Sequence, residues 1–156
     1  MISNIVVTDD ATESSEKAIT KAVELTQQLE ARLTLLHVID NIEVPASLIL
    51  GNDKVLIEGA RSKIGKALEK GWNKRVKDLI EKLRDDKDIL AIDSKCLSGN
   101  AAEKILEFVN TNKTDIIVMG ASRRLKGMSK IKALGSVTRK LQNRLVVLYF
   151  YKNHEN

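Results

Sequence analysis

The sequence predicts an α/β protein in which a five-stranded parallel sheet lies between two layers of helices, a three-layer α/β/α sandwich. Short apolar runs rich in β-branched residues recur along the chain, and segments with helical spacing of apolar residues separate them. One run, Leu33 to Ile39, is almost continuously apolar, which is typical of a strand buried on both faces of a parallel sheet. Strands that alternate with helices imply parallel pairing, because right-handed crossovers place a helix between successive strands.

The expected elements follow one another as β-α-β-α-β-α-β-α-β. Strands are expected over 4–8, 33–39, 89–97, 115–119 and 145–151, and helices over 14–30, 55–83, 102–109 and 134–143. The segment 40–53 contains the only proline, Pro45, and is expected to be a loop. Trp72 falls on the apolar stripe of the long second helix and is expected in the core. Without internal repeats, the chain is interpreted as a single domain over 1–152 and a short polar tail over 153–156, which is expected to be disordered.

Composition excludes several classes of protein. At 156 residues and 43% hydrophobic content, the chain can bury one core. No apolar stretch approaches the roughly 18 residues of a membrane span, and the N-terminus lacks the pattern of a signal peptide, so a cytoplasmic location without a membrane partner is expected. The only cysteine, Cys96, is expected to be a buried, inert thiol, and no metal site is expected.

The net charge of +5 and the pI near 9.3 suit an anionic ligand or surface. A nucleic-acid partner is not expected, because aromatic residues make up only 3% of the chain and the positive charges are scattered among acidic ones. His37 lies inside an apolar run and is interpreted as a satisfied core histidine rather than a catalytic residue.

Ligands of open parallel sheets bind beyond the carboxyl ends of the strands, where the strand order reverses. The candidate segments are therefore 9–12, 39–41, 98–100 and the residues from Gly120 onward. Asp10 has two readings that the sequence leaves open. It is either a ligand contact at this edge or the N-cap of the first helix, with Glu13 three residues later as in a capping box.

Three segments resemble the universal stress protein family: IVVTDDATESSEKAI, LTLLHVID and GNAAEKILEFVNTNKTDIIVMG. The residues that occupy the family's positions are Asp10, Thr12, Glu13, Ser15 and Ala18 after the first strand, and the pair His37 and Val38 at the end of the second. The resemblance covers nearly the whole chain. It implies a Rossmann-like fold of the adenine nucleotide alpha hydrolase-like type.

Members of this family that bind nucleotide carry a Gly-x-x-Gly-(nine residues)-Gly-Ser/Thr loop after the fourth strand. Such glycines let backbone N–H groups approach phosphate oxygens, and the following helix adds the positive end of its dipole. Gly120 and the pair Gly135 and Ser136 match the two ends of the loop. Arg123 stands at the place of the middle glycine, Gly127 comes four residues later, and the loop is two residues longer than the family pattern. The loop is either remodelled or degenerate.

The resemblance assigns nucleotide-binding positions residue by residue. They are Asp10, Val38, Met119, Gly120, Gly135 and Ser136, with Gly127 as a displaced stand-in for the middle glycine. If the loop is remodelled, Arg123, Arg124, Lys126 or Lys130 would supply further phosphate contacts. Asp10 would bind the adenine or ribose, and the Val38 backbone would contact the adenine edge. Met119 and Gly120 would line the floor of the pocket. The basic loop has two other readings, a solvated surface loop and a contact for an acidic partner.

The resemblance implies a stress-response regulatory or sensor protein that binds ATP or AMP, with Mg²⁺ as an accompanying ion. A nucleotide-free interaction protein with a degenerate loop and a weak ATPase are the alternatives. No catalytic residue is assigned, because no nucleophile–base pair stands near the loop and the Walker motif is missing. The last strand, LVVLYFY, has neither charge nor proline to protect an edge. Members of the family commonly dimerise through this strand, so the resemblance implies a homodimer. An unidentified protein partner is also expected.

Overall fold

The computed structural model describes residues 1–41, 54–87, 89, 91–121 and 146–151, of which 87, 121 and 146–151 are described by their backbone alone. The strands are β1 (Asn4–Thr8), β2 (Arg32–Ile39), β3 (Ile92–Ser98), β4 (Ile116–Ala121) and β5 (Val146–Tyr151). The helices are α1 (Glu13–Leu29), α2 (Lys54–Lys87) and α3 (Ala101–Thr111). The helix expected over 134–143 and most of the loop expected over 40–53 lie outside the described residues.

All five strands run parallel in one sheet, with the order β3-β2-β1-β4-β5. The chain builds the sheet in one direction through β3 and then crosses back to the other side of β1 to add β4 and β5. The strand order therefore reverses between β1 and β4, and the carboxyl ends of these two strands are where a ligand crevice is expected. The five-stranded parallel sheet of the sequence prediction is confirmed.

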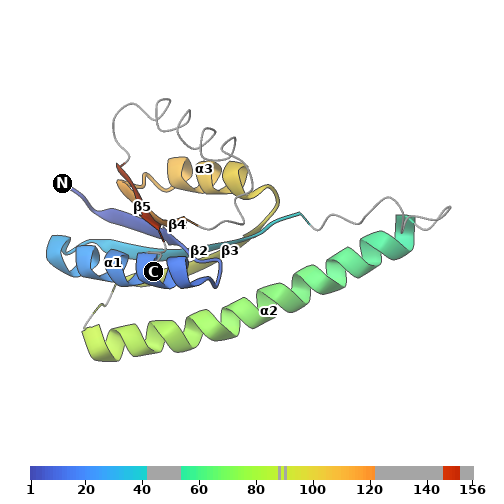
Figure 1. Cartoon of the computed structure of the whole chain (residues 1–156), viewed down its shortest axis with the longest axis horizontal. Helices are drawn as coiled ribbons and strands as arrows, with labels where there is room; N and C mark the ends of the chain where they lie inside the picture. The colour runs from blue at the N-terminus through green and yellow to red at the C-terminus, as the bar shows by residue number, and fades with distance from the viewer. Residues whose placement is uncertain (42–53, 88, 90, 122–145, 152–156) are drawn as a thin grey trace, which may run out of the picture.

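Helices cover both faces of the sheet, with α1 and α2 on one face and α3 on the other (Figure 1). The β1 residues alternate between the two layers. Ile5 and Val7 belong to the apolar cluster under α1 and α2, whereas Val6 belongs to the cluster under α3. This double burial is the reason that the strands consist of nearly unbroken apolar runs, and it confirms the three-layer sandwich.

Six strand boundaries differ from the sequence prediction by one to three residues, and two of them have a cause in the contacts between strands. The third strand begins at Ile92 rather than at 89, because its partner β2 begins at Arg32 and the ladder aligns Leu33 with Ile92. Asp115 precedes β4 instead of belonging to it. Its carboxylate accepts hydrogen bonds from the backbone N–H groups of Ser3 at 2.8 Å and Asn4 at 3.0 Å, so it holds the entry of β1 against that of β4.

The long helix α2 packs on the sheet through its C-terminal half. Trp72 and Val76 are 6% and 3% exposed and contact the cluster under α1, which confirms Trp72 as a core residue. The same apolar stripe continues N-terminally through Leu68 and Ile64, which are 49% and 47% exposed. Figure 1 shows the N-terminal half of α2 extending away from the sheet. None of the helices in the described part of the chain has the length and apolar character that a membrane crossing needs.

Cys96 is half-buried rather than buried, because its strand β3 is the edge strand of the sheet and has a neighbouring strand, β2, on one side only. Burial, together with the nearby carboxylate of Glu69, raises the pKa of the Cys96 thiol. A raised pKa lowers the fraction of reactive thiolate. The expectation of an inert thiol therefore stands, whereas that of full burial was wrong.

Candidate functional site

The turn between β1 and α1 lies at the carboxyl edge of the sheet and begins the candidate site. Thr12 is the N-cap of α1: its hydroxyl accepts a hydrogen bond from the Ser15 N–H, and the Ser15 hydroxyl accepts one from the Thr12 N–H at 3.1 Å. The reading of Asp10 as the N-cap, with Glu13 as its partner, was therefore wrong. The turn through Ala11, whose φ is 60°, separates Asp10 from the helix and moves the cap two residues along the chain.

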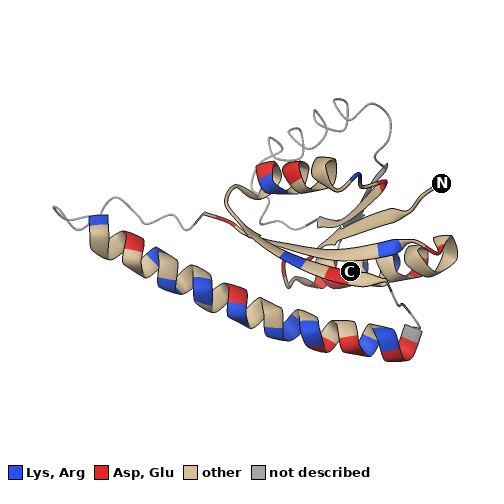
Figure 2. Cartoon of the chain, turned by 180° about the vertical axis from the view of Figure 1, so that it is seen from behind, with Lys and Arg blue, Asp and Glu red and all other residues tan. Residues whose placement is uncertain are grey.

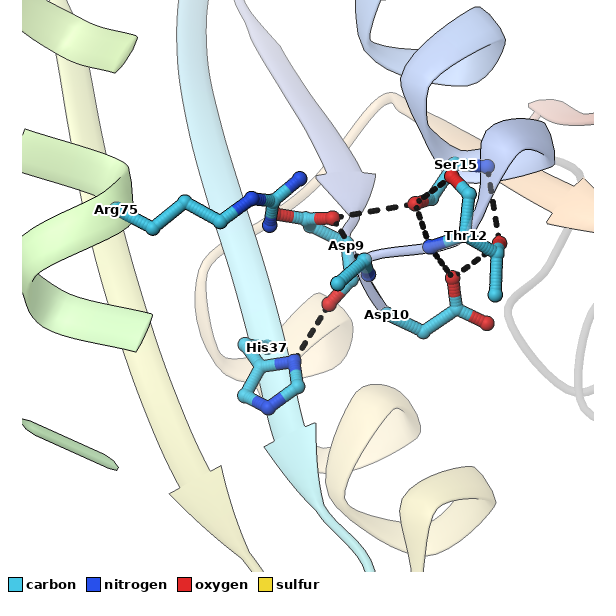
Figure 3. Close-up of polar contacts among 7 residues, drawn as sticks. Asp9, Asp10, Thr12, Ser15, His37 and Arg75 are labelled. Atoms are coloured by element: carbon cyan, nitrogen blue, oxygen red, sulfur yellow. Dashed lines mark hydrogen bonds and ion pairs between the residues drawn. The ribbon is translucent and has the colours of Figure 1, made fainter. Parts of the chain in front are cut away.

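Asp10 is held in place by one oxygen only. Its Oδ1 accepts hydrogen bonds from both the N–H and the hydroxyl of Thr12 (Figure 3). The side chain is exposed, and Oδ2 makes no hydrogen bond to any residue that the structure describes. Asp10 thus presents an oriented carboxylate with one free acceptor oxygen beside the end of β1.

The preceding residue, Asp9, is buried; the sequence analysis included it in the candidate segment 9–12 but assigned it no role. Its Oδ1 accepts hydrogen bonds from the Ala11 N–H at 3.0 Å and the Ser15 hydroxyl at 3.1 Å. Its Oδ2 pairs with Arg75 of α2, and its backbone carbonyl accepts a hydrogen bond from Nδ1 of His37 (Figure 3). Asp9 therefore links the first turn of α1, the end of β2 and the middle of α2.

The electrostatics of Asp9 follow from these contacts. Burial by itself raises the pKa of Asp9, but the Ala11 N–H, the Arg75 guanidinium and the Ser15 hydroxyl together outweigh it and lower the pKa below its ordinary value of 3.8. The carboxylate is therefore ionised at neutral pH and is a structural anion. A sequence signal did exist, since a carboxylate directly after a buried strand needs a partner, but the partner could not be read from the sequence.

His37 has a structural role next to Asp9. Its ring stacks on Trp72 with the centroids 5.4 Å apart and the planes at 14°. Nδ1 must carry the proton because it faces the Asp9 carbonyl, which can only accept. The ring is half-buried and its Nδ1 hydrogen bond is satisfied, which agrees with the expectation of a satisfied histidine.

Four of the residues that the sequence assigns to the site come together. Asp10, Val38, Met119 and Gly120 line one small cavity of about 90 Å³ at the carboxyl ends of β1, β2 and β4. Its remaining lining residues are Thr8, Asp9, Ser15, Leu36, Ala101 and Ile105. The four residues meet because the carboxyl ends of parallel strands share one edge of a sheet.

The backbone of Val38 faces this cavity. The backbone N–H and C=O groups of the even-numbered residues of β2 point toward β1. The Arg32 N–H donates a hydrogen bond to the Ser3 carbonyl, and the Leu36 carbonyl accepts one from the Asp9 N–H. β1 ends at Thr8, so the next residue on that side, Val38, has no strand partner there in the described part of the chain. Among the described residues its N–H has no backbone acceptor, and Val38 and Asp10 line the same cavity.

Gly120 is required by close packing. A Cβ at this position would lie 2.6 Å from the carbonyl carbon of Ser14 and 2.7 Å from the backbone nitrogen of Ser15. The start of α1 therefore rests directly on the backbone of β4. This contact fixes α1 against β4 and closes the floor of the cavity.

The remaining predicted positions lie outside the described residues: Arg123, Arg124, Lys126, Gly127, Lys130, Gly135 and Ser136. The structure therefore does not test the loop that the sequence assigns to the phosphates. Among the residues that are described, no three side chains of the metal-binding types are grouped closely enough to hold a metal ion.

A parallel sheet with a cavity at the reversal of strand order, lined by Asp10 and Val38, defines a doubly wound α/β protein with a candidate ligand site at its carboxyl edge. The model of the universal stress protein family matches residues 1–145, and the chain belongs to this family. No curated protein sequence matches the chain.

Solved structures of the same family share the fold. The chain is 20% identical to the universal stress protein UspA from Lactobacillus plantarum, with a TM-score of 0.66 and 97% of each chain covered. It is 15% identical to a universal stress protein from Arabidopsis thaliana with AMP bound, with a TM-score of 0.56 and coverage of 99% of this chain and 94% of that one. A universal stress protein in complex with cAMP is 19% identical, with a TM-score of 0.50 and 97% of each chain covered.

Proposed function

We propose that the protein is a stress-response regulator or sensor that binds an adenine nucleotide, ATP or AMP, at the carboxyl edge of its sheet. The observation that carries the proposal is the meeting of Asp10, Val38, Met119 and Gly120 at one cavity. Two similar structures contain AMP and cAMP, which supports an adenine nucleotide as the ligand class. Binding is the function, and no catalytic step is assigned.

The polar groups of the cavity complement an adenosine. The free Oδ2 of Asp10 can accept a hydrogen bond from the adenine amino group or a ribose hydroxyl, and the free Val38 N–H can donate to a ring nitrogen. The buried side chain of Met119 supplies an apolar wall. Adenine is a neutral, flat base with hydrogen-bond donors and acceptors on its edge, so it complements an acceptor, a donor and an apolar wall.

The size of the cavity limits what the described residues can hold. Its volume of about 90 Å³ is smaller than the roughly 300–1,000 Å³ of ordinary small-molecule sites. In this proposal the described residues bind the base, whereas Gly127, Gly135 and Ser136, with the basic residues before them, bind the phosphates. The same small volume favours the alternative of a nucleotide-free interaction protein with a degenerate loop.

Calorimetric titration of the purified protein with ATP, ADP and AMP, with and without Mg²⁺, tests the proposal. We expect micromolar binding in the unaltered protein and a loss of about 10- to 100-fold in Asp10→Ala, because a hydrogen bond to a charged group is worth about 1.5–3 kcal/mol. Asp78→Ala, which removes an exposed carboxylate from α2, is the matched control and should bind as the unaltered protein does. Gly135→Val tests the phosphate loop separately.

Binding that is absent up to millimolar nucleotide would contradict the proposal and support the nucleotide-free alternative. Binding that survives unchanged in Asp10→Ala would contradict the assigned geometry. Release of phosphate from ATP, lost together with binding in Asp10→Ala, would instead support the weak ATPase.

We also propose that the protein is a homodimer that pairs through β5. This strand is the last of the sheet next to β4, so one side of its backbone has no neighbouring strand among the described residues. An unpaired apolar edge strand is a site of association. Light scattering at micromolar concentration is expected to give twice the chain mass of 17.4 kDa, and a monomer mass would contradict the proposal.

A further inference from the structure

The outer face of α2 carries an uninterrupted row of lysines. The row consists of Lys63, Lys66, Lys70, Lys74 and Lys77, all of them exposed. At 3.6 residues per turn they fall within an arc of about 80° on the helix, and at 1.5 Å per residue the row is about 21 Å long. None of them forms an ion pair with any residue in the described part of the chain.

The lysine row faces away from the sheet. Trp72 and Val76 of the same helix are buried against the sheet, and the row lies on the opposite side of the helix. Arg75 points inward to Asp9 and is not part of the row. Figure 2 shows α2 as the outermost element along one side of the described molecule, with Lys and Arg along much of its length.

Acidic residues do not interrupt the lysine row. Between 54 and 77 the only carboxylates on α2 are Glu58 and Glu69, and the helical period puts both outside the arc of the lysines. The first carboxylate within the arc is Glu81, one turn beyond Lys77. The positive charge of the row is therefore not neutralised from its own helix.

Two apolar side chains stand at the N-terminal end of the row. Val55 and Leu56 are 80% and 72% exposed, the most exposed aliphatic residues of α2. The helical period puts them at the two borders of the lysine arc, about two turns before Lys63. Two adjacent exposed aliphatic side chains beside a basic row suit a ligand that is anionic and has an apolar part close to its charged surface.

We propose that the lysine row, together with Val55 and Leu56, docks the protein on an anionic lipid bilayer. A straight helix that lies on a flat bilayer contacts it along one side only, and the five lysines all lie on one side of α2. Peripheral attachment combines a basic patch, worth roughly fivefold in affinity for each lysine near the surface, with a small apolar insertion. Valine and leucine at one end of the helix provide that insertion.

The alternatives fit less well. Lysine is a hydrated point charge suited to a diffuse anionic surface, whereas recognition of individual phosphates or bases favours arginine forks and aromatic stacking, which the row lacks. A nucleic-acid backbone also offers nothing to Val55 and Leu56. The sequence-based expectation of no membrane partner followed from the absence of a spanning segment, and docking on the surface needs none.

Co-sedimentation with vesicles, without nucleotide, tests this proposal independently of the nucleotide site. The unaltered protein is expected to bind vesicles of phosphatidylcholine with about 30% phosphatidylserine, and not vesicles of phosphatidylcholine alone. A triple variant of the row, Lys63→Gln/Lys66→Gln/Lys70→Gln, is expected to bind the anionic vesicles about 100-fold more weakly. Glutamine is used because its helix propensity is close to that of lysine. The control with the same change of net charge is Lys17→Gln/Lys21→Gln/Lys104→Gln on α1 and α3, with an expected loss of less than about threefold.

Val55→Ser/Leu56→Ser separates the apolar contribution and is expected to weaken binding about tenfold without changing its salt dependence. The proposal is overturned if the protein ignores anionic vesicles, or if the two triple variants bind them equally. A protein that ignores vesicles but binds duplex DNA or polyglutamate through the lysine row would have a nucleic-acid or acidic-protein partner instead.

Discussion

Replacing Asp9 by asparagine is expected to lower the free energy of unfolding by about 2–3 kcal/mol at pH 7, measured by urea denaturation. The neutral amide cannot form an ion pair with Arg75, and it cannot accept hydrogen bonds through both of its terminal atoms as the carboxylate does, because its NH₂ group only donates. Removing one partner of a fully buried pair costs about 3–5 kcal/mol. We expect less here because the Arg75 side chain is 36% exposed, so water screens part of the interaction and solvates the arginine that remains.

The pH dependence gives this prediction a second measurement. The pKa of Asp9 in the folded protein lies below its ordinary value of 3.8, so the carboxylate binds a proton more readily in the unfolded chain. Its contribution to stability is therefore complete above about pH 5, where the unfolded chain has also lost the proton, and it is lost as the pH falls through the lower pKa of the folded state. The difference in stability between the unaltered protein and Asp9→Asn is expected to be constant from pH 7 to about pH 5 and to shrink below it.

The neighbouring carboxylate supplies the matched control. Asp10→Asn changes the same group one residue along the chain. Asp10 is exposed, and among the described residues its carboxylate forms hydrogen bonds with Thr12 alone, so a loss of less than about 1 kcal/mol is expected. Arg75→Met should raise the pKa of Asp9 and move acid unfolding to higher pH. Equal stability of the Asp9 and Asp10 variants would contradict the structural role of Asp9.

Gly120→Ala is expected to destabilise the fold by about 2–3 kcal/mol, measured in the same urea experiment. The added methyl group would meet the backbone of Ser14 and Ser15 at 2.6–2.7 Å, a distance that no side-chain rotation relieves. The start of α1 would have to move away from β4. This movement would also open the floor of the cavity that Asp10 and Met119 share, so nucleotide binding is expected to weaken together with stability.

Gly71→Ala is the control for this substitution. A Cβ at Gly71 meets no atom within 4 Å, and the residue lies inside α2, where alanine is a better helix former than glycine. We expect this variant to be more stable than the unaltered protein by about 0.5–1 kcal/mol. A Gly120→Ala variant as stable as Gly71→Ala would show that α1 and β4 are not in close contact.

Local patterns were sufficient for most of the architecture. The apolar runs identified all five strands, and the helical spacing identified α1, α2 and α3, because burial on both faces of a sheet and on one face of a helix leaves different periods in the sequence. The predicted ends of the strands and helices were less exact, because an end depends on contacts with other residues, some of them far away in the sequence. β3 begins where β2 offers its first backbone partner, and α1 begins after a turn through Ala11 that local propensity does not indicate.

Part of the candidate site was also accessible from the sequence. Asp10, Val38, Met119 and Gly120 each follow or end a predicted strand, and the parallel order alone brings such positions to one edge. The role of Asp10 was undecided between cap and ligand contact, because both readings need the same residue type in the same place. In the structure the hydroxyl of Thr12 accepts a hydrogen bond from the Ser15 N–H, and the hydroxyl of Ser15 accepts one from the Thr12 N–H. These two hydrogen bonds identify Thr12 as the N-cap of the helix.

The sequence by itself determined the alternation of strands and helices and the carboxyl-edge position of the candidate site, since these follow from periodicity and chain order. The resemblance of three segments indicated the family. Only the tertiary structure decided which charged residues pair across long sequence distances and which of them point to the solvent. Asp9 and Arg75 are 66 residues apart, and their pairing exists only because α2 crosses the sheet beside the end of β1. The lysines of α2 form an outward row for the same reason: Trp72 and Val76 must be buried, and burying them fixes the rotation of the helix.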